Sequence, residues 1–232
     1  MINYKLYQDD CLKIMKQIPD KSIDLIVTDP PFGLPDDLPI DDVIVRLIEC
    51  NRISKRMIIL MDWRNFWRVD KEFHSIKIGE LIWEYGWISG GRTKAKCGYF
   101  PTHNTIGLYG NKQDFKFVSD GSIIKRQPGF SSPRQCSFAK KSGHPYEKPI
   151  KLMEYLILNS SIECETILDP FMGSGSTGIA CINTNRNFIG IELDEKYFQI
   201  AKERLESCTS SAVNSSVNNK LIDNNNKSIK LF

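Results

Sequence analysis

Hydrophobic and polar residues alternate along this chain in short blocks, and the blocks predict strands and helices in turn. Strands are expected at residues 4–8, 23–27, 56–61, 81–87, 105–109, 166–168 and 187–192. Helices are expected at residues 11–18, 42–50, 149–157, 174–183 and 194–205. Residues 23–27 are apolar almost throughout, which is typical of a strand covered on both faces. The alternation therefore predicts an α/β fold with a doubly wound, mostly parallel sheet that binds ligands at the carboxyl ends of its strands.

The alternating pattern ends near residue 206, so we expect one domain to span residues 1–206. Residues 207–232 contain six Asn and six Ser, few aromatic residues and no apolar period. Such a segment buries too little apolar surface to offset the entropy lost on ordering, and we expect it to be disordered. Three apolar residues stand at its far end: Ile229, Leu231 and Phe232.

The composition is that of an ordinary globular domain, with 41% hydrophobic and 25% charged residues. No apolar run approaches the roughly 20 residues that span a bilayer, and the first residues lack the pattern of a signal peptide. Seven cysteines without a C-x-x-C pair, beside only three histidines, indicate free thiols in a reducing compartment. We therefore expect a cytoplasmic protein with no membrane segment and no metal site.

Positive charge is concentrated in the middle of the chain. Between Arg92 and Lys141 there are ten basic and two acidic residues, a local charge of +8 in a chain whose net charge is +3. Aromatic residues, glycines and serines are interspersed among the basic ones. A cationic, loop-rich surface of this kind suits contact with a phosphate backbone, and we favour nucleic-acid binding over a merely solvated face.

A glycine-rich segment follows the predicted strand at residues 166–168. Gly173, Gly175 and Gly178 match the G-x-G-x-x-G pattern, whereas the lysine of a phosphate-binding P-loop is missing. Glu192, at the end of the next strand, is placed to accept hydrogen bonds from both ribose hydroxyls of a nucleoside ligand. NAD and S-adenosylmethionine share that nucleoside, so this pattern alone leaves both open.

A second chemical motif comes earlier in the chain, directly after the strand at residues 23–27, and consists of Asp29, Pro30, Pro31 and Phe32. Together with the later F-x-G-x-G loop it resembles the β class of S-adenosylmethionine-dependent DNA amino-methyltransferases, in which the catalytic motif precedes the cofactor motif. Residues 144–149 resemble that family's H-P-x-x-K-P element, and residues 102–109 resemble its T-H-E-x-I-L-x-Y strand, with Asn104 replacing the acid. The resemblance covers nearly all of residues 4–205, and it implies a Rossmann-like methyltransferase fold.

The resemblance implies S-adenosylmethionine as cofactor. Asp10 matches the family's contact to the adenine amino group, although Asp9 stands where glycine is usual. Lys148 would meet the cofactor carboxylate or a backbone carbonyl, and the loop's glycines would mainly let the methionine part approach the backbone. The full expected set is Asp10, Lys148, Asp169, Phe171, Gly173, Ser174, Gly175, Ser176, Thr177 and Glu192.

The same resemblance assigns the chemistry to the first motif. The Asp29 carboxylate and the Pro30 carbonyl would accept the two hydrogens of an exocyclic amine, and Pro31 would help to fix that backbone. Phe32 would stack on a base flipped out of the duplex. Asp at the first position is commoner in the family for adenine N6 than for cytosine N4. We therefore expect site-specific adenine methylation, as in restriction–modification systems, with N4-cytosine as the alternative.

Residues 113–142 form the individual part of the chain, and we expect them to be a small target-recognition insert. The candidates for contact with double-stranded DNA are Arg92, Lys94, Lys125, Arg126, Arg134 and Gln135. Homodimers are common in the resembled class. The last residues resemble short C-terminal peptides with which bacterial DNA enzymes dock on the replication sliding clamp, although Ser228 stands where glutamine is usual.

Three rival functions remain open at this point. A methyltransferase acting on RNA or on a free nucleobase would share both motifs. A catalytically silent DNA-binding scaffold would be expected to have lost Asp29 or the glycine loop, and neither is lost. An NAD-dependent dehydrogenase would place its glycine loop near the start of the domain and would need a catalytic group that we cannot assign.

Overall fold

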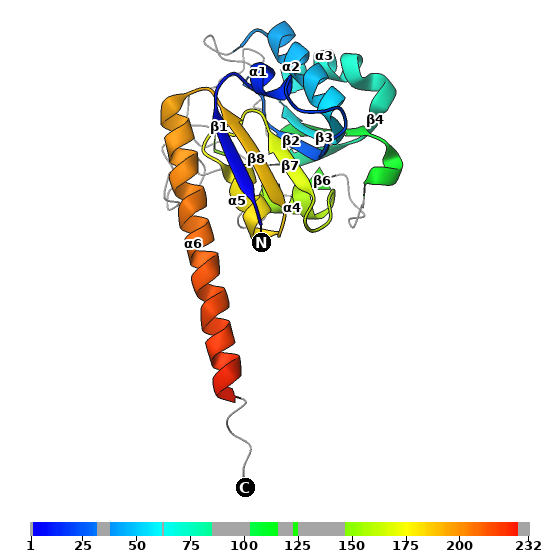
Figure 1. Cartoon of the computed structure of the whole chain (residues 1–232). Helices are drawn as coiled ribbons and strands as arrows, with labels where there is room; N and C mark the ends of the chain where they lie inside the picture. Colours follow the sequence, from blue (N-terminus) through cyan, green and yellow to red (C-terminus); the bar gives the residue numbers. More distant parts are fainter. Residues whose placement is uncertain are drawn as a thin grey trace, which may run out of the picture.

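The computed structural model describes residues 2–31, 38–61, 63–84, 103–115, 123–124 and 147–226. Its strands form one sheet (Figure 1), and in chain order they are β1 (Tyr4–Gln8), β2 (Ile23–Thr28), β3 (Ser54–Met61), β4 (Lys77–Glu84), β5 (His103–Gly110), β6 (Ile123–Ile124), β7 (Thr166–Asp169) and β8 (Asn187–Glu192). The helices are α1 (Cys11–Met15), α2 (Ile40–Ile53), α3 (Trp63–Phe73), α4 (Ile150–Leu158), α5 (Ser176–Asn183) and α6 (Glu195–Asn226), with short 3-10 helices at His74–Ile76 and Lys112–Asp114.

Strand order in the sheet differs from chain order and runs β1-β8-β7-β2-β3-β5-β4-β6. The first five strands of this row pair in parallel. β5 is antiparallel to both of its neighbours, and β6 pairs in parallel with β4. Among the described strands only β5 therefore runs against the others, and the predicted mostly parallel sheet is confirmed.

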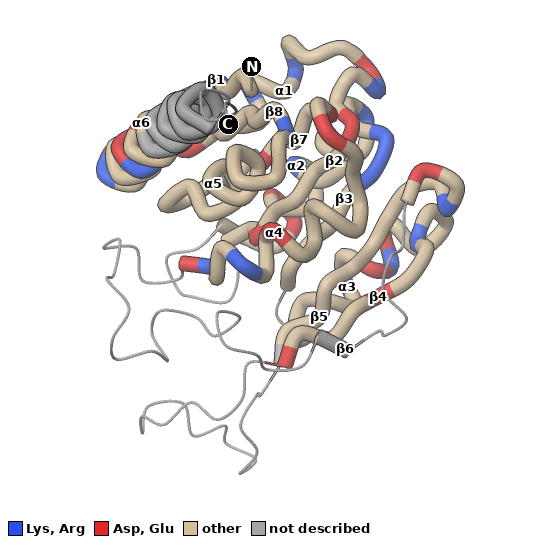
Figure 2. The backbone as a smooth tube through the Cα atoms, turned by 90° about the horizontal axis from the view of Figure 1, so that it is seen from below, with Lys and Arg blue, Asp and Glu red and all other residues tan. Residues whose placement is uncertain are grey.

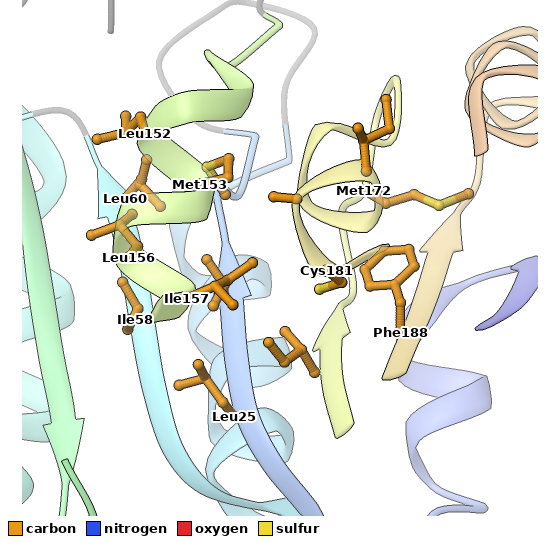
Figure 3. Packing of buried hydrophobic residues seen from close by; sticks show 14 of the residues in the cluster. Leu25, Ile58, Leu60, Leu152, Met153, Leu156, Ile157, Met172, Cys181 and Phe188 are labelled. Carbon is orange, nitrogen blue, oxygen red and sulfur yellow. The ribbon is translucent and has the colours of Figure 1, made fainter. Parts of the chain in front are cut away.

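Helices cover both faces of the sheet, as a doubly wound fold requires. Leu25 and Val27 of β2 pack on one face with the apolar residues of α4, α5 and α6, and α5 lies between the other two helices (Figure 2). Figure 3 shows the side chains of α4 turned toward those of β2 and β3. Ile26 packs on the other face with α1, α2 and α3. The strand is thus buried on both sides, which explains its nearly continuous apolar sequence.

Several element boundaries differ from the predicted ones. α3 was not predicted, because polar and aromatic residues dominate its first turns. Among the α3 residues whose burial is described, Val69 and Phe73 are the only buried ones. β4 begins at Lys77 instead of residue 81, and its predicted end at residues 85–87 lies outside the described chain. Pro149 is the N-cap of α4 and not its first helical residue.

The C-terminal segment also differs from its prediction. Residues 207–226 were expected to be disordered, whereas α6 continues through them to Asn226. Elongating a helix that is already anchored costs less than nucleating one, and Ala201 and Leu205 anchor α6 in the core. At the start of the polar segment the hydroxyls of Thr209 and Ser210 donate to carbonyls one turn earlier, which satisfies them inside the helix. Residues 227–232 lie outside the described part.

Candidate active site

Four polar residues stand where four neighbouring parallel strands end. Asp29 follows β2, Asp169 ends β7, Glu192 ends β8, and Asp10 follows β1. These strands lie side by side in the order β1-β8-β7-β2, so their carboxyl ends meet at one edge of the sheet. The candidate catalytic and cofactor motifs, about 140 residues apart in sequence, are thereby brought together, at the edge where parallel sheets bind ligands.

Asp169 is buried, and both of its carboxylate oxygens are engaged within the protein. The Thr28 hydroxyl donates to Oδ1 over 2.9 Å, the Thr177 hydroxyl donates to Oδ2 over 2.6 Å, and the Phe171 N–H donates to Oδ1 over 3.1 Å. Burial raises the pKa of Asp169 to about 6, against the opposing effect of these hydrogen bonds and with a smaller contribution from the charge of Asp29. Asp169 therefore ties the end of β2 to the loop after β7 and to the first turn of α5.

The glycines of this loop serve packing as well as backbone shape. Gly173 and Gly175 have φ values of +52° and +80°, a left-handed conformation that favours glycine. A Cβ on Gly175 would lie 2.8 Å from Leu205 Cδ1, and one on Gly178 would lie 2.6 Å from a Phe188 ring carbon. Gly175 and Gly178 thus let α5 approach α6 and β8, whereas the resemblance implies that the loop glycines mainly allow a ligand to approach the backbone.

Glu192 is bonded to the glycine loop. Its Oε2 accepts the Gly173 N–H and its Oε1 accepts the Asp194 N–H, both over 2.9 Å. Burial raises the pKa of Glu192 above its ordinary value, and the backbone hydrogen bonds oppose that rise. Each carboxylate oxygen has two acceptor sites, so the group can still accept ligand hydroxyls. The next residue, Leu193, is 68% exposed and was not singled out from the sequence, although an apolar residue after an acid at a strand end could have drawn attention to it.

Asp10 has two partners within the chain. Its Oδ1 caps α1 by accepting the Leu12 N–H over 2.7 Å, and its Oδ2 pairs with Arg46 of α2 over 2.9 Å. Arg46 was not predicted, because nothing local in the sequence connects it to Asp10. Contact of Asp10 with a cofactor stays a prediction.

Asp29 is half-buried, and its Oδ2 is paired with the ammonium group of Lys148. Pro30 is buried and Pro31 partly buried, while Phe32 lies outside the described residues. Lys148 was expected to meet a cofactor carboxylate or a backbone carbonyl, and in the structure its described partner is the Asp29 carboxylate instead. Contact of Lys148 with a cofactor stays a prediction.

Two further residues of the site are Arg204, which was missed from the sequence, and Ser176, which belongs to the predicted cofactor set. Arg204 of α6 donates to the Ser174 carbonyl over 2.6 Å and to Glu147 Oε1 over 2.5 Å. Ser176, the first residue of α5, is 6% exposed, and its hydroxyl has no hydrogen-bond partner among the described residues. A buried polar atom normally has a partner, so this hydroxyl is available to a polar group of a ligand.

The predicted DNA-contact residues do not fall in the described chain. This holds for Arg92, Lys94, Lys125, Arg126, Arg134 and Gln135, and also for the C-terminal Ile229, Leu231 and Phe232. Within the part of the chain that is described, no group of three or more His, Cys, Asp or Glu residues could hold a metal ion. No helix among those described residues is long and apolar enough to cross a membrane.

The chain is similar in sequence to known proteins along most of its length. A family model described as DNA methylase matches residues 23–203. The type II methyltransferase M2.LlaDCHI of Lactococcus lactis subsp. cremoris is 30% identical, with 88% of this chain and 89% of that protein aligned. The DNA adenine methyltransferase YhdJ of Escherichia coli (strain K12) is 28% identical, with 85% of this chain and 81% of that protein aligned.

Solved structures agree with the sequence relatives. The structure of an M1.HpyAVI–SAM complex has a TM-score of 0.66 and 25% sequence identity, and the match covers 87% of this chain and 98% of that one. The cytosine-N4-specific PvuII DNA methyltransferase has a TM-score of 0.71 at 16% identity, with 90% of each chain covered, a likeness that shows the fold alone.

Proposed function

The chain belongs to the DNA methylase family, and from that membership we propose that it methylates N6 of adenine at specific sites in duplex DNA, with S-adenosylmethionine as cofactor. The observation that supports this most directly is the position of Asp29. It stands at the end of β2, next to β7 in the sheet, and the glycine loop begins where β7 ends. A catalytic carboxylate and a nucleoside-binding loop thus share one edge, and the named adenine methyltransferase YhdJ aligns across most of the chain.

The chemistry of the target explains why an aspartate and a proline stand here. The lone pair of an exocyclic amine is delocalised into the base, so the nitrogen is a poor nucleophile. Asp29 would accept one N–H and the Pro30 carbonyl would accept the other, which draws the nitrogen toward tetrahedral geometry and frees its lone pair. The fixed φ of Pro31 restrains the direction of that carbonyl. Rate enhancement then comes from positioning and from preorganised charge, without a covalent enzyme intermediate.

The residues at the edge of the sheet fit S-adenosylmethionine. The remaining acceptor sites of Glu192 suit ribose hydroxyls, and the buried Ser176 hydroxyl at the start of α5 lacks a described partner. Leu193 offers an exposed apolar side chain beside Glu192, where an adenine ring could pack. When bound, the cofactor supplies an electrophilic methyl group on a sulfonium. Asp10, Phe171, Ser174 and Thr177 complete the set, with Asp169 holding the loop in place, while Lys148, also predicted as a cofactor residue, has the Asp29 carboxylate as its described partner.

N4-cytosine methylation is the second candidate, because the same acceptors suit either amine. Asp29 favours adenine, because Asp at the first motif position is commoner for adenine N6 in the family that the sequence resembles. The name of one sequence relative, the DNA adenine methyltransferase YhdJ, also favours adenine, whereas the cytosine-specific PvuII enzyme is similar in fold alone.

A transfer assay tests the proposed function. Purified protein is incubated with labelled S-adenosylmethionine and mixed-sequence duplex DNA, and the nucleosides are then analysed. We expect N6-methyladenine from the wild type and at least about 100-fold less from Asp29→Ala, since a positioned acceptor is lost in the transition state. N4-methylcytosine would replace the adenine assignment. Binding of DNA and cofactor without any transfer would favour an RNA substrate or a silent scaffold.

The finer partner predictions are also part of this proposal. We propose a cytoplasmic enzyme whose basic insert, residues 113–142, reads the target site, and which assembles as a homodimer. Docking on the sliding clamp through Ile229, Leu231 and Phe232 is a prediction from their sequence alone. Deleting residues 228–232 and measuring clamp binding by calorimetry would test it.

A further inference from the structure

Glu147 and Lys148 are consecutive residues that lead into α4, yet their side chains contact different halves of the site. The Lys148 ammonium pairs with Oδ2 of Asp29, in the catalytic half. Glu147 Oε1 accepts a hydrogen bond from Arg204 over 2.5 Å, and Arg204 also donates to the Ser174 carbonyl of the glycine loop over 2.6 Å. Two adjacent residues thereby connect the cofactor loop with the catalytic carboxylate.

The local backbone explains why the two side chains diverge. Lys148 precedes Pro149, and a residue before proline is restricted to extended conformations. In extended chain, successive side chains point to opposite sides. Pro149 itself caps α4, whose Leu152 and Leu156 are buried in the core, so the dipeptide is attached to a fixed element (Figure 3).

These contacts are less exposed than an ordinary surface ion pair. The side chain of Glu147 is 7% exposed, that of Lys148 is 16% exposed, and that of Asp29 is 30% exposed. One turn further along, Lys151 pairs with Glu154, but the lysine is 67% exposed. Charge-assisted hydrogen bonds hold geometry better where water is partly excluded, whereas exposed pairs contribute little.

We propose that Glu147 and Lys148 are positioning residues that form a strap between the two halves of the site. The terminal torsion of an aspartate is soft, so an unrestrained Asp29 would turn its carboxylate freely. With Lys148 held on Oδ2, the carboxylate keeps one orientation and presents Oδ1 to the target amine. Glu147, through Arg204, fixes the glycine loop relative to that carboxylate. The inference rests on the proposed methyl transfer and adds to it the alignment of the two halves.

Three variants separate positioning from ligand binding. Lys148→Met keeps the length of the side chain and removes its charge, and we expect kcat to fall about 10- to 100-fold because transfer depends on alignment. Affinity for S-adenosylmethionine, measured by calorimetry on the protein alone, should change by less than about threefold. Lys148→Arg should recover most of the lost kcat, since its guanidinium still donates to Asp29. Lys151→Met, the matched control, should behave as the wild type.

Two results of these kinetic and binding assays would overturn the strap. One is a Lys148→Met variant with wild-type kcat, and the other is a variant with weakened cofactor affinity and unchanged kcat at saturation, which would make Lys148 a cofactor ligand only. A double-mutant cycle of Asp29→Ala and Lys148→Met, measured on the free energy of unfolding, gives the coupling energy between the two side chains without any substrate. We expect measurable coupling, and its absence would also overturn the strap. An inactive wild type with intact coupling would count against the proposed function alone.

Discussion

Replacing Asp169 by Asn should remove a pH-dependent part of the folding stability. Burial raises the pKa of this carboxyl from its ordinary 3.8 to about 6 in the folded protein. The folded state therefore binds the proton more tightly than the unfolded chain does. The stability gained from proton uptake is fully present below the unfolded pKa and is lost as the pH rises through about 6.

The size of the effect follows from the two pKa values. For a single group with these values, lowering the pH from about 7.5 to about 5 stabilises the fold by about 1.4 kcal/mol, and lowering it to about 4 gives about 2.4 kcal/mol. Asn has no such titration. Its amide oxygen can accept from Thr28 and from the Phe171 N–H, and its amide nitrogen can donate to the Thr177 hydroxyl.

Urea unfolding at a series of pH values measures this directly. The difference in unfolding free energy between wild type and Asp169→Asn should grow in favour of the wild type as the pH falls from about 7.5 to about 5. Asp24→Asn is a control of opposite sign. Although burial opposes it, hydrogen bonds from Lys55 and the Thr166 N–H lower the pKa of Asp24, so its contribution should shrink as the pH falls. Parallel curves for wild type and Asp169→Asn would refute the reasoning.

Three further predictions concern packing, a buried ion pair and the cofactor loop. Gly175→Ala should lower the free energy of unfolding, measured by calorimetry, by about 2–4 kcal/mol, because of its left-handed φ and the close approach of the added Cβ to Leu205. Gly79→Ala is the control: its added Cβ meets nothing nearer than 3.9 Å, so its stability should stay within about 1 kcal/mol of wild type. Arg56→Met should cost about 3–5 kcal/mol in urea unfolding, because it leaves Glu165 without its buried partner; a loss under about 1 kcal/mol would contradict this. Glu192→Gln should weaken S-adenosylmethionine binding about 10-fold, whereas unchanged affinity in a calorimetric titration would exclude Glu192 as a ligand.

Much of the fold was predictable because its signals are local. The apolar run of β2 and the alternation of strands and helices follow from side-chain periodicity alone, and they identified the α/β class. The order of the two motifs was equally visible. α3 was missed because aromatic and polar residues obscure its period, and the helical continuation of α6 was missed because composition carries no information on an anchored helix.

The sequence by itself determined that Asp29 and the glycine loop each follow a strand, since turn chemistry and periodicity depend on neighbours along the chain. Only the tertiary structure decided that β7 pairs with β2, which lets Thr28 bond to Asp169 across 141 residues. It also decided that Lys148 meets Asp29 and that Arg204 reaches the Ser174 carbonyl. Such contacts depend on which strands and helices pack together, and no local pattern records that choice.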